Sequence, residues 1–171
     1  MIKPGEIQNK ARVVGVRDQQ IEKDYILSWI LQGIAQHEHL SKTIFFKGGT
    51  VLKKVYFEDY RISEDLDFTL LNNEISNDKI FKWFAEVFEY VLEEANISLE
   101  IIDNNEHEDG GINFYISYIG PLAGQVLIRK SKRISHEVKH WFLNPSSIKS
   151  FLNTQIRKTM NCFATRWKRC L

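Results

Sequence analysis

The stretch from Ser63 to Leu71 restricts the fold of this 171-residue chain more than any other segment. Apolar and polar residues alternate along it, and a period of two predicts a strand with one buried face. The other face carries Asp65 and Asp67, and neighbouring carboxylates repel each other unless a cation lies between them. The segment therefore predicts either a metal site or, as is typical of an isolated Asp-x-Asp, a solvated strand face. The apolar face holds Leu66, Phe68 and Leu70, and the opposite face holds Asp65, Asp67 and Thr69.

The segments around this strand predict a single α/β (α+β) domain over residues 1–171, with a mixed sheet flanked by helices. Apolar residues at helical spacing predict helices from about Gln20 to Gln36 and from about Asn77 to Ala95. Residues 1–19 are expected to form a short helix or an ordered arm, and Asp103–Gly111 an acidic loop. The other expected elements are strands at Ser41–Phe46, Ile97–Ile102, Ile112–Ile119 and Gly124–Arg129, and weakly periodic helices at Ser135–Leu143 and Ser147–Ala164.

The pair Gly48-Gly49 ends the expected strand at Phe46 and precedes a helix that Thr50 is expected to cap. Glycines at such a turn let the backbone approach a phosphate, and the start of a helix presents N–H groups to an anion. Lys47 adds a positive charge, and the Thr50 hydroxyl adds a donor. The alternative is a plain strand-to-helix turn that needs glycine for its backbone angles, and a lone Gly-Gly-Thr favours that alternative.

Considered together, the glycine turn and the acidic strand favour a binding site over a plain turn and a solvated strand face. If the strands neighbour each other, a phosphate-binding turn lies beside an acidic pair, and such a site can hold a triphosphate with its metal. Ligation by oxygen alone suits Mg²⁺ or Mn²⁺.

The two segments together resemble the signature of the AbiEii/MenT nucleotidyltransferase toxins. That signature has a Phe-Lys-Gly-Gly-Thr-x-Leu stretch followed by Arg-x-Ser-Glu-Asp-Leu-Asp-Phe. The upstream run that starts at Ile21, Ile-Glu-Lys-Asp-Tyr-Ile-Leu, is also similar to the family, and the resemblance covers roughly residues 15–125. The matching residues are Phe46, Lys47, Gly48, Gly49, Thr50 and Leu52, then Arg61, Ser63, Glu64, Asp65, Leu66, Asp67 and Phe68.

The resemblance implies a polymerase-beta-like nucleotidyltransferase fold and the transfer of NMP from an NTP, in some members onto tRNA. It implies that Asp65 and Asp67 bind Mg²⁺ (or Mn²⁺) as catalytic and metal-ligating residues. It also implies a toxin that a separate antitoxin protein neutralises. The nucleotide-binding residues it implies are Lys47, Gly48, Gly49, Thr50, Arg61 and Ser63.

The match fails where such enzymes carry a third carboxylate on a later strand. No Asp or Glu occurs between Gly110 and His136, so Glu137 is the first candidate, with Glu100 and Asp103 as alternatives on an earlier strand. Residues from about 126 to 171 form a basic, atypical segment. Truncation or a shifted reading frame beyond about residue 125 is the hypothesis that explains both departures. A chain lacking its C-terminal lobe would expose apolar surface, and a homodimer is one way to cover it.

The charge is distributed unevenly. Residues 1–120 contain 12 Lys and Arg against 21 Asp and Glu, whereas residues 121–171 contain 11 against one. The basic segment either binds a polyanion, with Arg129 and Lys130 as candidate RNA contacts, or covers the acidic part of its own fold. No apolar stretch approaches the ~18 residues of a membrane span. With no apolar leader and only Cys162 and Cys170, the chain is expected to be cytoplasmic, with no membrane partner.

Three functions follow from these observations. The first is a Mg²⁺-dependent nucleotidyltransferase that moves NMP from an NTP to RNA, with Asp65, Asp67 and Glu137 as catalytic residues. The second is a catalytically inactive relic of that fold that still binds metal or nucleotide. The third is a module that binds RNA or an antitoxin through the basic C-terminal segment.

Overall fold

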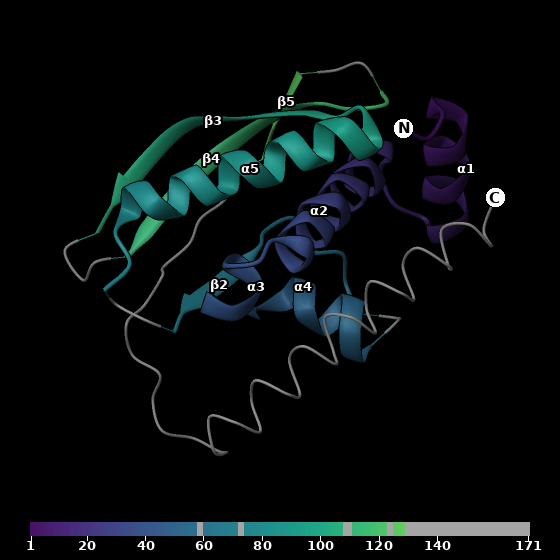
Figure 1. Cartoon of the computed structure of the whole chain (residues 1–171). Helices are drawn as coiled ribbons and strands as arrows, with labels where there is room; N and C mark the ends of the chain where they lie inside the picture. The colour runs from purple at the N-terminus through teal and green to yellow at the C-terminus, as the bar shows by residue number, and fades with distance from the viewer. Residues whose placement is uncertain (58–59, 72–73, 108–110, 123–124, 129–171) are drawn as a thin grey trace.

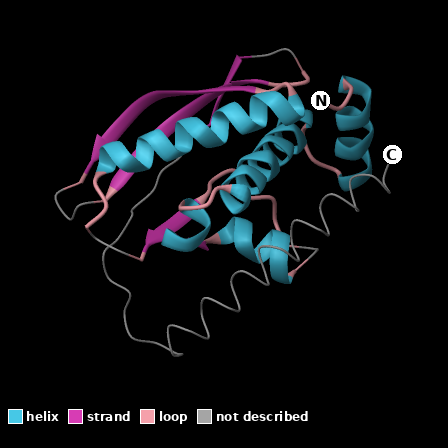
Figure 2. Cartoon of the chain, viewed as in Figure 1, coloured by secondary structure: helices cyan, strands magenta, loops and turns pink. Residues whose placement is uncertain are grey.

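The computed structural model describes residues 1–57, 60–71, 74–107, 111–122 and 125–128, and the expected helices at Ser135–Leu143 and Ser147–Ala164 lie outside these ranges. The chain folds into helices and small antiparallel sheets (Figures 1 and 2). The elements are α1 (Pro4–Val14), α2 (Asp18–Gln36), α3 (Leu40–Thr43), β1 (Ile44–Lys47), α4 (Gly49–Val51), the π-helix η1 (Leu52–Tyr56), β2 (Asp67–Leu70), α5 (Asn77–Ala95), β3 (Ser98–Glu106), β4 (Ile112–Ile119) and β5 (Gln125–Ile128).

The predicted fold class is confirmed, although the strands pair differently from the single mixed sheet expected. The described strands form two antiparallel sheets, one of β1 and β2 and one in the order β3-β4-β5. Helix α5 lies along the three-stranded sheet, and α2 packs between α5 and α1 (Figure 1). A Cβ atom on Gly33 of α2 would lie 2.7 Å from Val87 Cγ1 of α5, so glycine is what permits this close crossing.

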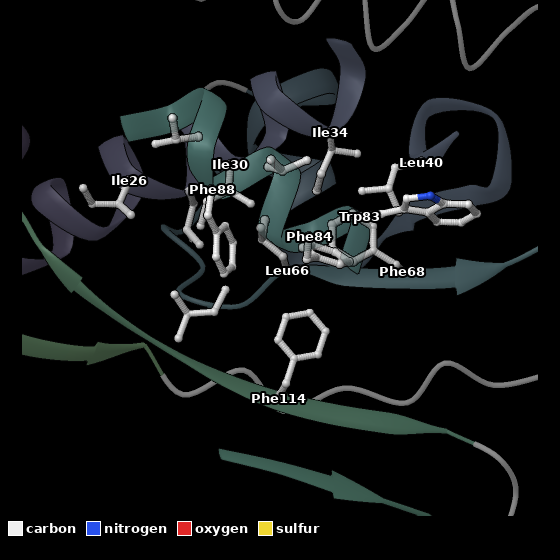
Figure 3. Packing of buried hydrophobic residues seen from close by; sticks show 14 of the residues in the cluster. Ile26, Ile30, Ile34, Leu40, Leu66, Phe68, Trp83, Phe84, Phe88 and Phe114 are labelled. Atoms are coloured by element: carbon white, nitrogen blue, oxygen red, sulfur yellow. The ribbon is translucent and has the colours of Figure 1, made fainter. Parts of the chain in front are cut away.

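Aromatic side chains join the two sheets through α5. Phe84 of α5 makes an edge-to-face contact with Phe114 of β4, with ring centroids 4.9 Å apart, and lies 6.3 Å from Phe68 of β2. Leu66 and Phe68 point into this core from the segment that carries the acidic pair (Figure 3). The core therefore fixes the backbone on which Asp65 and Asp67 lie.

The helices predicted from about Gln20 to Gln36 and from about Asn77 to Ala95 and the strand Ile112–Ile119 are confirmed, and α5 has the expected bounds. The expected strand at Ser41–Phe46 is wrong at its start, because Leu40–Thr43 is a helical turn. The His37 ring explains this turn: its Nδ1 atom accepts hydrogen bonds from the backbone N–H groups of His39 and Leu40, at 3.2 and 3.1 Å. The strand proper, β1, begins only at Ile44.

Two other boundaries differ from the prediction. The expected acidic loop at Asp103–Gly111 is wrong for Asp103–Glu106, which pair with β4 and extend β3 after a bulge at Ile102. The expected strand at Ser63–Leu71 shortens to Asp67–Leu70, because its partner β1 ends at Lys47, opposite Asp67. Thr69, expected on the same face as Asp67, is buried opposite Phe45.

Candidate nucleotide site

The turn after β1 brings the two signature segments into contact. In the β1–β2 ladder, Lys47 lies opposite Asp67. The next residue, Gly48, has φ 85° and ψ −170°, backbone angles that only glycine adopts without strain. A Cβ atom there would lie 2.0 Å from Asp67 Oδ2 and 2.8 Å from its Cγ. The Asp67 carboxylate therefore rests directly on the backbone of the turn, in space that any side chain would fill.

Gly49 makes the second contact between the segments. A Cβ atom at this position would lie 3.3 Å from Ser63 Oγ and 4.0 Å from Arg61 Nη2. The hydroxyl of Ser63 and the guanidinium of the exposed Arg61 thus lie beside the glycine turn. A basic group, a hydroxyl and open backbone next to one another are groups that a phosphate can contact.

Thr50 makes the third contact, in a way that the sequence did not indicate. The expected helix cap is wrong, because Gly48 occupies the N-cap position of α4. The Thr50 side chain is 1% exposed, and its hydroxyl donates to the backbone carbonyl of Asp65. The expected hydroxyl donor to phosphate thus already donates within the protein, where it ties the glycine turn to the acidic segment.

Asp65 and Asp67 lie on either side of Leu66, which is 1% exposed. The alternation of half-buried and buried residues continues from Asp65 through Phe68, although Asp65 precedes the strand. The two carboxylates are therefore on the side opposite the core. Mg²⁺ usually binds one or two protein carboxylates and takes its other ligands from water and phosphate, so this pair fits a magnesium ion.

Among the described residues, no third carboxylate joins Asp65 and Asp67 in a cluster. The described part of the chain contains no group of three His, Cys, Asp or Glu side chains able to hold a metal. Glu100 and Asp103 are exposed on β3, and Glu100 lies on the opposite face from Leu99 and Ile101, which pack against the core. Glu137, Arg129 and Lys130 lie outside the described residues.

Lys54 is buried behind the glycine turn and was not predicted as part of the site. The π-helix η1 turns its side chain, 2% exposed, toward α2. There Nζ donates to Asp24 Oδ1 at 2.7 Å and to Ser28 Oγ at 2.9 Å. Burial lowers the pKa of Lys54, and Asp24 opposes part of that shift. The sequence signal for this contact was the spacing of Asp24 and Ser28, which are four residues apart and so lie on the same face of the helix.

Two further side-chain contacts of α2 were also not predicted from the sequence. Lys23 forms an ion pair with Glu64, the residue before Asp65. Glu22 is fully buried, and its carboxylate accepts hydrogen bonds from the Leu122 backbone N–H at 2.7 Å and from the Tyr118 hydroxyl at 3.4 Å. Burial, reinforced by the nearby Glu22 charge, raises the pKa of Tyr118. A glutamate next to Ile21 on an apolar helix face was the signal that a buried partner exists.

One comparison with known proteins identifies a family. No curated protein matches the chain. None of the helices in the described ranges is long and apolar enough to span a bilayer. Residues 29–129, more than half of the chain, match the family described as nucleotidyl transferase AbiEii toxin, type IV TA system. This matched region includes the glycine turn, the acidic pair and the strands that follow them. The chain therefore belongs to the AbiEii family of nucleotidyltransferase toxins.

Proposed function

We propose that this protein is a Mg²⁺-dependent (or Mn²⁺-dependent) enzyme that transfers NMP from an NTP to an RNA acceptor such as tRNA. In this proposal it acts in the cytoplasm as the toxin of a toxin–antitoxin pair, with an antitoxin protein as partner. The observation that carries the proposal is the contact between the Asp67 carboxylate and the Gly48 backbone. It joins a group suited to a metal with a turn suited to a phosphate.

The residues of the chain have distinct roles in this proposal. The backbone of Gly48 and Gly49, with the Lys47 charge, receives the triphosphate, and Arg61 and Ser63 contact it from beside Gly49. Asp65 and Asp67 hold the metal ion. When bound, the ion neutralises charge on the phosphates during transfer.

The acceptor and the base are assigned to the C-terminal part of the chain. Arg129 and Lys130 contact the phosphate backbone of the acceptor RNA, in keeping with the strongly basic composition of residues 121–171. Glu137 takes the proton from the attacking hydroxyl. These assignments rest on the sequence.

Label transfer tests the proposal directly. The purified chain is incubated with each α-labelled NTP, Mg²⁺ and total tRNA, beside the double variant Asp65→Ala/Asp67→Ala. A matched control is Glu93→Ala/Glu94→Ala, which removes two exposed carboxylates from α5. We expect label in RNA with the wild type and the control, and none with the acidic-pair variant. An acidic-pair variant that still labels RNA, or a folded wild type that labels none, would contradict the proposal.

One observation favours a second candidate, an inactive protein that binds nucleotide. The described residues place no third acidic side chain in a cluster with Asp65 and Asp67. This candidate predicts that the wild type binds Mn²⁺ with a nucleotide, seen in the electron paramagnetic resonance spectrum of Mn²⁺, but transfers no label. Binding should then be lost in Asp65→Ala/Asp67→Ala and kept in Glu93→Ala/Glu94→Ala.

A further inference from the structure

Three consecutive residues of α2 bond to three separate segments around the candidate site. Successive helix positions are turned by about 100° from one another, so neighbours on a helix do not face the same partner. The side chains of Glu22, Lys23 and Asp24 therefore point in three different directions from the helix. We infer that these three are positioning residues that hold the parts of the nucleotidyltransferase site in their relative places. The inference rests on the proposed function.

Lys23 holds the acidic segment. Its ammonium group forms an ion pair with Glu64, and the side chains are 18% and 40% exposed. Because Glu64 directly precedes Asp65, this bond fixes the backbone at the start of the metal-binding pair. The same backbone is also held by the Thr50 hydroxyl, which donates to the Asp65 carbonyl.

Asp24 holds the segment that follows the glycine turn. Its carboxylate accepts a hydrogen bond from Lys54 at 2.7 Å, and its backbone carbonyl accepts a second from the same ammonium at 3.3 Å. Ser28, one turn further along α2, also accepts from Lys54. Three acceptors on one helix thus fix η1, which continues directly from α4 and the turn at Gly48 and Gly49.

Glu22 holds the connection between β4 and β5. It accepts hydrogen bonds from the Leu122 backbone N–H and the Tyr118 hydroxyl, one on each side of Gly120. A Cβ atom on Gly120 would lie 2.6 Å from Glu22 Oε1, so glycine permits the carboxylate to approach. Leu122 lies three residues before β5 in the sequence.

These contacts distinguish a role in positioning the site segments from a role in closing the hydrophobic core. A helix that only closed the core would present apolar residues here, as α2 does at Ile26 and Ile30. Instead, each charged residue contacts a segment adjacent to the glycine turn, the acidic pair or the start of β5. Loss of the partly exposed link between Lys23 and Glu64 should therefore change the site geometry more than it changes folding.

The pair Lys23 and Glu64 gives the clearest test, because both side chains are partly exposed and their removal should leave the fold intact. The variants are Lys23→Met, Glu64→Gln, the two combined, and Lys23→Arg, which preserves the ion pair. For each we would measure kcat and KM for NMP transfer and the midpoint of urea unfolding. The control pair is Lys42→Met and Glu38→Gln, an ion pair between α3 and a residue that precedes it, with side chains 65% and 77% exposed.

We expect each single loss to lower kcat by at least about tenfold, since displacement by ~1 Å can cost ~100-fold. The combined variant should be no worse than either single one, because both remove the same bond. Lys23→Arg should recover most of the activity, and unfolding midpoints should stay close to that of the wild type. The control pair should leave kcat unchanged.

The outcomes separate this inference from the function on which it rests. A wild type that transfers NMP while Lys23→Met keeps its kcat would overturn the positioning role alone. So would losses in Lys23→Met and Glu64→Gln that multiply in the combined variant. A wild type that transfers no NMP to RNA would overturn the proposed function and this inference with it.

Discussion

Substitution of Gly48 by alanine should damage the site more than any other single methyl group added to the turn. Two effects act together. The backbone at φ 85° strains any side chain, at a cost of roughly 1–3 kcal/mol. The new Cβ would also lie 2.0 Å from Asp67 Oδ2, so the carboxylate must move by about 1 Å to reach even the shortest tolerated contact of 3.0 Å.

Rotation of the Asp67 side chain can relieve the contacts with Oδ2 and Cγ, but it moves the carboxylate away from the turn and leaves the Asp67 Cβ 2.9 Å from the new methyl group. The carboxylate is therefore displaced whether the side chain rotates or the turn shifts. A displacement of ~1 Å at a reacting centre can reduce the rate by ~100-fold. We therefore expect Gly48→Ala to lose about 1–3 kcal/mol in the free energy of unfolding by urea, and about 100-fold in kcat for NMP transfer.

Two glycine variants separate these effects. Gly15→Ala carries the strain alone, because Gly15 has φ 76° with open space around its Cβ position. It should lose stability and keep kcat. Gly49→Ala brings a methyl group 3.3 Å from Ser63 Oγ, a contact that a small shift relieves, and its loss of kcat should be smaller. If Gly48→Ala kept the wild-type kcat while losing only as much stability as Gly15→Ala, the proposed contact between turn and carboxylate would have no catalytic role.

Two further predictions concern the framework. Gly33→Ala should lower the free energy of unfolding by about 1–3 kcal/mol, because its methyl group would overlap Val87, and Val87→Ala should restore part of the loss in a double variant measured by urea unfolding. Burial lowers the pKa of Lys54, so the unfolded chain binds more protons than the folded one between the folded pKa and the ordinary value of 10.5. The unfolding free energy of the wild type should accordingly rise relative to Lys54→Met as the pH approaches 10.5, and parallel pH profiles for the two proteins would refute this reasoning.

Local patterns in the sequence were sufficient for the elements with a strong period. Helix α5 has buried residues at Ile80, Phe84 and Val87, spaced at three and four, and its bounds were predicted correctly. The end of β3 carries Asp103 and other exposed polar residues, which have no alternation to signal a strand. The α3 turn depends on the His37 ring as a hydrogen-bond acceptor, a side-chain contact that periodicity does not encode.

The candidate site was predictable only in part, for a related physical reason. The glycine turn and the acidic pair stand out because their residue types suit phosphate and metal. The bonds that hold them in place, such as Lys23 with Glu64 and Asp24 with Lys54, join residues 41 and 30 positions apart. Such pairs depend on how α2 packs, and a single sequence does not show it. The roles of the site residues themselves remain predictions for the experiments above.

The bonds made by Glu22 also have a consequence for the order in which the protein is made. Its partners Tyr118 and Leu122 follow it by 96 and 100 residues. During synthesis the N-terminal part of a chain emerges first, and a domain generally folds as a unit. A nascent chain that has already exposed both the glycine turn and the acidic pair still lacks the partners that fix α2 from the far side. We expect such a ribosome-bound intermediate to be inactive, so that the proposed transferase activity would begin only after residue 122 has left the ribosome.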